Sequence, residues 1–228
     1  MKKIDCSRCP AHARSAFAGL TPRKCQELSI AREEKKFSAG DVIEFQFEKE
    51  AGFFCLAKGY WKVRFQSAQG DRTVRIAGPG DLVGFGECMV SEKKHLAEAI
   101  EDSEACFISK SSFENILSKD PEVMQRLILA MCKVMEIKDE RIAGLANTSV
   151  KARVAAMLLS LSEKFGKAEG EGRRIEPVLD RKTMASLSGT VPETLARVLT
   201  EFEENRIVQR TGRAIYVLDK AQLGKYLV

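Results

Sequence analysis

Two predicted helices with a glycine-centred break between them constrain the C-terminal part of this chain more than any other feature. The helices are expected over 181–187 and 191–205, and Ser188-Gly189-Thr190 separates them. Glycine at the break supplies the positive φ that lets the two helices cross steeply. Short strands predicted at 207–209 and 214–217 follow. The order of helix, turn, helix and β-hairpin predicts a winged helix-turn-helix.

The second predicted helix divides into a buried and an outward face. The side chains expected to pack between the two helices are Leu187, Val191, Leu195, Val198 and Leu199. Glu193, Thr194, Ala196 and Arg197 then point outward near the helix N-terminus. In helix-turn-helix proteins this is the end that contacts base edges in the major groove.

Glu193 and Arg197 have the chemistry of base-reading side chains. Arg197 can donate two hydrogen bonds to guanine O6 and N7, and Glu193 can accept one from a cytosine amine. A glutamate that only caps the helix is the plainer interpretation, but it does not account for Arg197 four residues later. We therefore predict base contacts from these two residues, with Pro192 and Ala196 beside them. The predicted phosphate contacts are Arg181, Lys182, Val191, Thr194, Arg210 and Arg213.

The formal net charge of +5 is modest, and most of the excess lies after residue 147, which fits a nucleic-acid surface there. We find no set of residues typical of an enzyme active site. No apolar run approaches the roughly 18–20 residues that a membrane span needs. The lysines at the N-terminus have no apolar stretch behind them, so no secretory signal is predicted. A cytoplasmic protein is expected.

An apolar stripe in the region after Pro121 predicts a helix that pairs with another helix. Its members are spaced alternately three and four residues apart, as at the a and d positions of a coiled coil. They are Ile128, Met131, Met135, Lys138, Ile142 and Leu145. Packing of this helix on its own β domain is the alternative. The length of the stripe and its lysine favour a dimer seam, because a polar group on a seam sets register.

Short β runs cut by glycine turns fill the region from about residue 20 to 108, which predicts a β sandwich or barrel. The whole chain is therefore expected to be α+β. The predicted parts are an N-terminal cysteine-containing segment (1–19), a β sensor domain (20–119), a dimerisation helix (120–147) and a winged helix-turn-helix domain (148–228).

Over essentially its whole length the chain resembles the CRP/FNR superfamily of bacterial transcription regulators. Residues 37–43 resemble the start of that family's cyclic-nucleotide-binding-like β-roll, and 79–84 match its glycine pattern. Residues 189–197 resemble its recognition helix, with the glutamate and arginine at the spacing of Glu193 and Arg197. The resemblance implies a homodimer on palindromic double-stranded DNA, with RNA polymerase as a further partner.

One departure from the family pattern narrows the expected DNA target. The CRP-type arginine that precedes the glutamate is Pro192 here, which has no donor. A TTGA-like half-site of the FNR type is therefore favoured over a TGTGA-like one.

The resemblance suggests three candidate signals, of which cAMP is the first. In the relatives an Arg-Ser pair holds the cyclic phosphate a few residues after Gly-Glu. Gly86-Glu87 is present, but Leu96-Ala97 stands where Arg-Ser would be. A buried phosphate would lack its cation, so the sequence disfavours cAMP.

A [4Fe–4S] cluster is the second candidate, and it commonly needs four thiolates. Cys6 and Cys9 form a Cys-x-x-Cys pair, and Cys106 lies in a segment that resembles the one carrying the distal cluster cysteine of the FNR oxygen sensor. The family's third N-terminal cysteine would fall near Ser15 or Phe17, where this chain has none.

The nearest spare thiol is Cys25, and His12 is a non-thiolate substitute. A cluster with a displaced ligand and a lineage that has lost the cluster both stay open. The other cysteines, Cys55, Cys88 and Cys132, are interpreted as core or seam residues.

Haem is the third candidate, because 191–194 resembles the recognition helix of nitrosative-stress and denitrification regulators. The only histidines are His12 and His95, and no Cys-x-x-Cys-His is present, so covalent haem is excluded. His95 as a surface-loop residue is a plainer interpretation than His95 as an axial ligand. We expect control by a redox or gas signal, O2 or NO. A small-ligand-responsive or ligand-independent regulator is the alternative.

Overall fold

The computed structural model describes residues 6–47, 50–68, 70–90 and 94–227. The chain divides into two compact units, Met1–Glu136 and Ile137–Val228, and the boundary falls inside one long helix. Of the described helices, none is long and apolar enough to cross a membrane.

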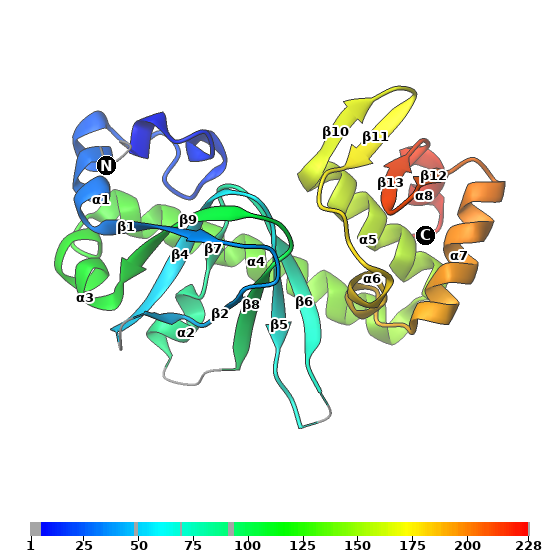
Figure 1. Cartoon of the computed structure of the whole chain (residues 1–228), viewed down its shortest axis with the longest axis horizontal. Helices are drawn as coiled ribbons and strands as arrows, with labels where there is room; N and C mark the ends of the chain where they lie inside the picture. The colour runs from blue at the N-terminus through cyan, green and yellow to red at the C-terminus, as the bar shows by residue number, and fades with distance from the viewer. Residues whose placement is uncertain (1–5, 48–49, 69, 91–93, 228) are drawn as a thin grey trace. The chain divides into compact units, whose positions relative to one another are not determined.

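Two antiparallel sheets build the first unit (Figure 1), as the glycine-punctuated β pattern predicts. One sheet has the order β1-β9-β4-β3, with β7 also paired to β4, and the other has the order β2-β8-β5-β6. The strands of the first sheet are β1 (Arg32–Phe37), β3 (Gln46–Phe47), β4 (Glu50–Lys58), β7 (Leu82–Val83) and β9 (Ser103–Ser109). Those of the second are β2 (Val42–Ile43), β5 (Trp61–Phe65), β6 (Arg72–Ala77) and β8 (His95–Ala99).

An aromatic core lies between the two sheets. Trp61 is fully buried and meets Phe37 and Phe54 edge to face, at centroid distances of 5.1 and 5.4 Å. Its indole N–H donates to the hydroxyl of Ser103 (2.7 Å), so the buried polar atom is satisfied.

A second core covers the other face of the first sheet. It contains Phe53 and Ile108 from the sheet, Leu28 from α1 (Pro22–Ile30) and Leu127 from α4 (Pro121–Asn147). Successive side chains of a strand point to opposite faces, so Phe53 enters this core while Phe54 enters the aromatic core. The short elements around this face are η1 (Cys6–Arg8), η2 (His12–Arg14), α2 (Phe85–Met89), α3 (Lys110–Ser112) and η3 (Phe113–Leu117).

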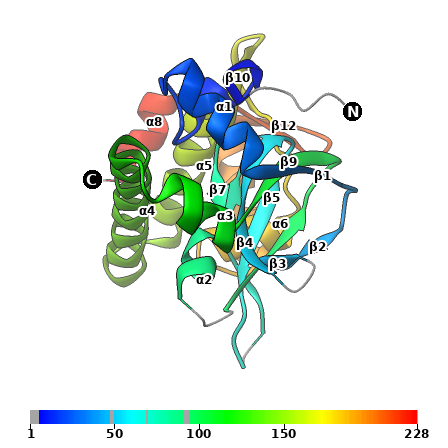
Figure 2. The ribbon, with the colours of Figure 1, turned by 90° about the vertical axis from the view of Figure 1, so that its left-hand side faces the viewer.

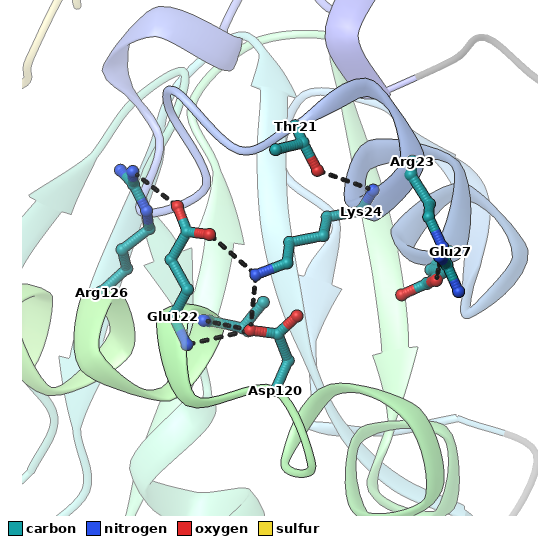
Figure 3. A network of polar contacts seen from close by, with 8 residues as sticks. Thr21, Arg23, Lys24, Glu27, Asp120, Glu122 and Arg126 are labelled. Carbon is teal, nitrogen blue, oxygen red and sulfur yellow. Dashed lines mark hydrogen bonds and ion pairs between the residues drawn. The ribbon is translucent and has the colours of Figure 1, made fainter.

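Helix α4 begins at an aspartate cap that also anchors α1. The Asp120 carboxylate accepts from the backbone N–H groups of Glu122 (2.9 Å) and Val123 (3.2 Å). Lys24 of α1 reaches across to Asp120 (2.9 Å) and Glu122 (2.7 Å), as Figure 3 shows. Arg126 pairs with Glu122 (3.1 Å) and donates to the carbonyl of Ala18.

The second unit has the predicted helices and a four-stranded sheet of order β10-β11-β13-β12. Its elements are α5 (Val150–Phe165), β10 (Gly166–Glu169), β11 (Gly172–Ile175), α6 (Arg181–Leu187), α7 (Pro192–Glu204), β12 (Val208–Thr211), β13 (Ala214–Val217) and α8 (Lys220–Lys225). The stretch 166–174 is mostly the β10–β11 hairpin, and β11 also pairs with β13.

Candidate functional site

The turn between α6 and α7 is held by two arginines from outside it. Gly189 has the predicted positive φ of 61°. Arg153 of α5 donates to the carbonyls of Thr148 (2.8 Å), Ser188 (3.0 Å) and Gly189 (3.2 Å), and Arg141 of α4 donates to that of Ser186 (2.9 Å). The last carbonyls of a helix lack partners within the helix, so these guanidinium groups satisfy them. Neither arginine was identified from the sequence.

The buried face of α7 consists of Leu195, Val198, Leu199 and Phe202. Val191, expected on this face, is instead 55% exposed. The helix starts at Pro192, and Val191 is the extended residue before it (φ −103°, ψ 154°), so its side chain is not part of the helical stripe. Phe202, one turn further along, was missed although it continues the same spacing.

The predicted base-reading residues lie on the outward side of α7, which is the orange helix of Figure 1. Glu193 and Arg197 are exposed, and Pro192 and Ala196 are partly exposed. Thr194, a predicted phosphate contact on the same helix, is also partly exposed. Because the opposite face is buried and the preceding turn is clamped, the backbone that carries this surface is rigid.

The four charged residues among the predicted phosphate contacts fall into two groups. Arg181 and Lys182 are exposed in the first turn of α6, and Arg213 is exposed at the tip of the β12–β13 hairpin. Arg210 is placed differently, because its Nε donates to the Glu203 carboxylate (2.9 Å) and its backbone N–H does the same (3.0 Å). These hydrogen bonds lower the pKa of Glu203. Arg210 therefore joins the hairpin to α7 in this structure.

The predicted seam residues of α4 leave an apolar stripe exposed on the single chain. Ile128, Met131, Met135 and Ile142 are between 45% and 65% exposed, and Lys138 is exposed among them. The side chain of Leu145 lies outside the described residues. Val123 and Leu127, on the other face, are buried in the second core.

The two positions where the relatives have the Arg-Ser pair carry apolar side chains here. Ala97 is fully buried in the aromatic core, and Leu96 is partly buried beside it in β8. Glu87 pairs with Nδ1 of His95, whose ring also meets Phe65 edge to face at 5.2 Å. His95 is thus engaged by Glu87 rather than held open for an axial bond.

Four thiols line one pocket at the end of the first sheet. Cys6 and Cys9 come from the N-terminal turns, Cys55 from β4 and Cys106 from β9, and His12, Ser15 and Arg32 complete the polar lining. Figure 2 shows the N-terminal turns and α1 over the edge of the sheet that carries β1 and β9.

Three of the four predicted metal ligands, Cys6, Cys9 and Cys106, therefore meet in this pocket, and Cys25 does not line it. Cys25 is fully buried in the second core, where its thiol approaches the carbonyl of Leu20 (3.7 Å). Cys55, interpreted as a core residue, lines the pocket in its place.

Burial and one cation set the electrostatics of the thiol pocket. Burial raises the pKa of Cys6 to about 11, and it also raises the pKa of Cys55 and of Cys106. The buried Arg32 guanidinium donates to the sulfur of Cys106 and opposes these shifts. The Nδ1 atom of His12 is buried without a hydrogen-bond partner among the described residues.

The donor set of the pocket suits an iron–sulfur cluster, since thiolates are the ligands such clusters use. In the described part of the chain, no three side chains of the ligand types converge closely enough to hold a single metal ion. The residues that would hold a cluster are the four pocket thiols, and the cluster would supply sensitivity to oxidation.

Comparison with known proteins agrees with this architecture. Residues 34–120 match the cyclic nucleotide-binding domain, and residues 152–226 match the Crp-like helix-turn-helix domain. The fumarate and nitrate reduction regulatory protein of Vibrio cholerae is 26% identical over 85% of this chain and 75% of its own. The CRP-like cAMP-activated global transcriptional regulator of Mycobacterium tuberculosis is 23% identical over 92% of this chain and 94% of its own.

A solved structure of a CRP/FNR-family transcriptional regulator from Thermus thermophilus has the same fold. Its TM-score is 0.70 at 24% identity, over 86% of this chain and 98% of that one. The chain belongs to the CRP/FNR family of DNA-binding transcription regulators.

Proposed function

We propose that this chain is a homodimeric regulator that binds a TTGA-like palindrome through α7 and responds to a redox or gas signal through its N-terminal domain. The observation that carries the proposal is the exposed Glu193 and Arg197 pair on a helix whose other face is buried. An arginine presented in this way can grip guanine through both O6 and N7.

The exposed stripe on α4 supports the homodimer. Contiguous apolar surface on a monomer is costly in water and commonly marks an interface. A second copy of α4 offers a complementary surface, because the same stripe repeats on it. Two copies of α7 in a symmetric dimer then match the two halves of a palindrome. RNA polymerase would be the further partner, and the cytoplasm is the expected location.

A chain of polar contacts connects the thiol pocket to α4 within the first unit. The backbone N–H of Cys6 donates to the hydroxyl of Ser29 in α1 (2.9 Å). Lys24 of the same helix binds Asp120 and Glu122 at the start of α4. A shift of the cysteine-bearing turns would therefore displace α1 and, through Lys24, the helix that carries the proposed seam.

Binding of a fluorescent TTGA palindrome by Arg197→Ala and by the unmodified protein tests the proposal. Loss of a bidentate guanine contact is expected to weaken binding by about 1–3 kcal/mol per half-site, or about 5- to 150-fold for each of the two half-sites. Lys167→Ala is the matched control, because it removes a positive charge from an exposed strand of the same domain. If Arg197→Ala binds the palindrome as tightly as the unmodified protein does, α7 is not the element that recognises the base sequence.

A further inference from the structure

We propose that Cys55 is the fourth ligand of a [4Fe–4S] cluster held by Cys6, Cys9 and Cys106. It would replace the N-terminal cysteine that is absent at Ser15 and Phe17. This inference rests on the redox signal in the proposed function and deepens it, because it places half of the cluster's ligands on the sheet.

The register of the first sheet places Cys55 beside Cys106. The two residues are direct partners in the antiparallel pairing of β4 and β9. Side chains directly opposite one another in such a pair lie on the same face, with Cβ atoms about 4.5–5.5 Å apart. This is the face of Phe53 and Ile108, and the N-terminal turns cover it at the pocket.

Backbone hydrogen bonds shape the turns that carry the Cys-x-x-Cys pair. The N–H of Cys9 donates to the carbonyl of Cys6 (3.2 Å), and the N–H of His12 donates to that of Cys9 (2.9 Å). Gly80 lies so close to Arg14 that a Cβ there would be 2.7 Å from the Arg14 backbone. The missing side chain at Gly80 thus lets the N-terminal turns sit against the sheet.

The spacing of the thiols favours a cluster over a single ion. The ligand side chains do not converge on one point in the described residues. The thiolates of a four-iron cluster stand farther apart than those around one ion, because the iron and sulfide atoms lie between them. The pocket now holds about 20 Å³, room for about one water molecule. Cys55 and Cys106 are fixed by the sheet, so the turns with Cys6 and Cys9 would move outward to admit the cluster.

Arg32 is the cation that this site needs. Ligation replaces the proton of each thiol by an Fe–S bond, so four protons leave to water and the site becomes anionic. Arg32 is 6% exposed and already donates to the sulfur of Cys106. A buried guanidinium beside the thiolates offsets their charge where water cannot.

Anaerobic reconstitution of the full chain with ferric iron, sulfide and a thiol reductant tests the ligand set. The variants are Cys55→Ser, Cys55→Ala, Cys106→Ser and Cys25→Ser, and the readouts are iron and acid-labile sulfide per chain together with the visible spectrum. The unmodified protein and Cys25→Ser are expected to hold about four irons. Both Cys55 variants are expected to lose the cluster as fully as Cys106→Ser does. Circular dichroism of each variant without iron checks that it folds.

Several outcomes would overturn the inference. One is a full cluster in both Cys55 variants, and another is loss of the cluster only in Cys25→Ser. An unmodified protein that binds no iron and instead forms a Cys55–Cys106 disulfide in air would also overturn it. Palindrome binding measured on the same samples separates the two proposals. Intact binding without iron refutes the cluster alone, whereas a full cluster without palindrome binding refutes the DNA target alone.

Discussion

Arginine side chains hold both functional regions together at the scale of single residues. Arg153 donates to two carbonyls in the turn before α7 and to that of Thr148 before α5, and Arg32 donates to a cysteine sulfur in the thiol pocket. A guanidinium group suits both places because its several donors point in fixed directions. The first arginine positions the proposed reading helix, and the second balances charge at the proposed sensor.

Replacing Arg153 by alanine is expected to destabilise the second unit by about 2–3 kcal/mol, because charged hydrogen bonds to carbonyls at a helix end are lost. Urea unfolding followed by circular dichroism measures this. Arg181→Ala is the control, since Arg181 is exposed in the first turn of α6. If Arg153→Ala lowers stability no more than the control does, Arg153 does not hold the turn between α6 and α7.

The raised pKa of Cys6 predicts slow alkylation of the metal-free protein. At about 11 it lies well above the roughly 8.5 of a free cysteine. Only the thiolate reacts with iodoacetamide. The alkylation rate at Cys6 should therefore keep rising between pH 9 and pH 11, a range in which the alkylation rate of a free cysteine has nearly levelled off. Peptide mass spectrometry after timed iodoacetamide treatment follows Cys6 by itself. A plateau below pH 9 would show that burial does not control this thiol.

At the scale of elements, the two faces of helix α4 have different roles. Its buried side packs on the sheet through Val123 and Leu127, while its exposed stripe has no cover within the described chain. Its first turn is tied to α1 by Lys24. One helix thus carries both the proposed dimer contact and the connection to the thiol pocket.

Substituting Met135 by glutamate is expected to convert a dimer to a monomer, because a buried carboxylate would face its own copy across the seam. Sedimentation velocity gives the oligomeric state directly. Lys133→Glu, on the same helix but off the stripe, is the control and should stay dimeric. If Met135→Glu is as dimeric as the control, the seam lies elsewhere.

Replacing Lys24 by methionine is expected to uncouple the signal from DNA binding. The ion pairs lower the pKa values of Asp120 and Glu122, so their stabilisation is present at neutral pH and is lost as pH falls through those lowered values. The pairs are partly exposed to solvent, so the loss of stability is expected to be small. The ratio of palindrome affinity in anaerobic and air-treated samples should approach one. If this ratio is the same as in the unmodified protein, the signal does not pass through Lys24.

Across the whole molecule, what could be predicted follows from how local each signal is. The bounds of α6 could be predicted from Gly189 and the helical spacing of the sequence. The apolar stripe of α4 could be predicted because its residues recur three and four positions apart. The pairing of Cys55 with Cys106 could not be predicted from the sequence, because strand register depends on pairing between residues 51 positions apart. Arg153 was missed for the same reason, since its partners lie 35 and 36 residues away.

Arg197 of α7 is proposed to recognise a guanine in each half-site. A double-mutant cycle tests it most directly, with the unmodified protein and Arg197→Ala each measured on TTGA and on a palindrome whose guanines are changed to adenines. The unmodified protein is expected to lose about 1–3 kcal/mol of binding free energy per half-site on the changed DNA, while Arg197→Ala is expected to bind both sequences equally. Equal discrimination by the two proteins would contradict it, because some other residue would then recognise that base.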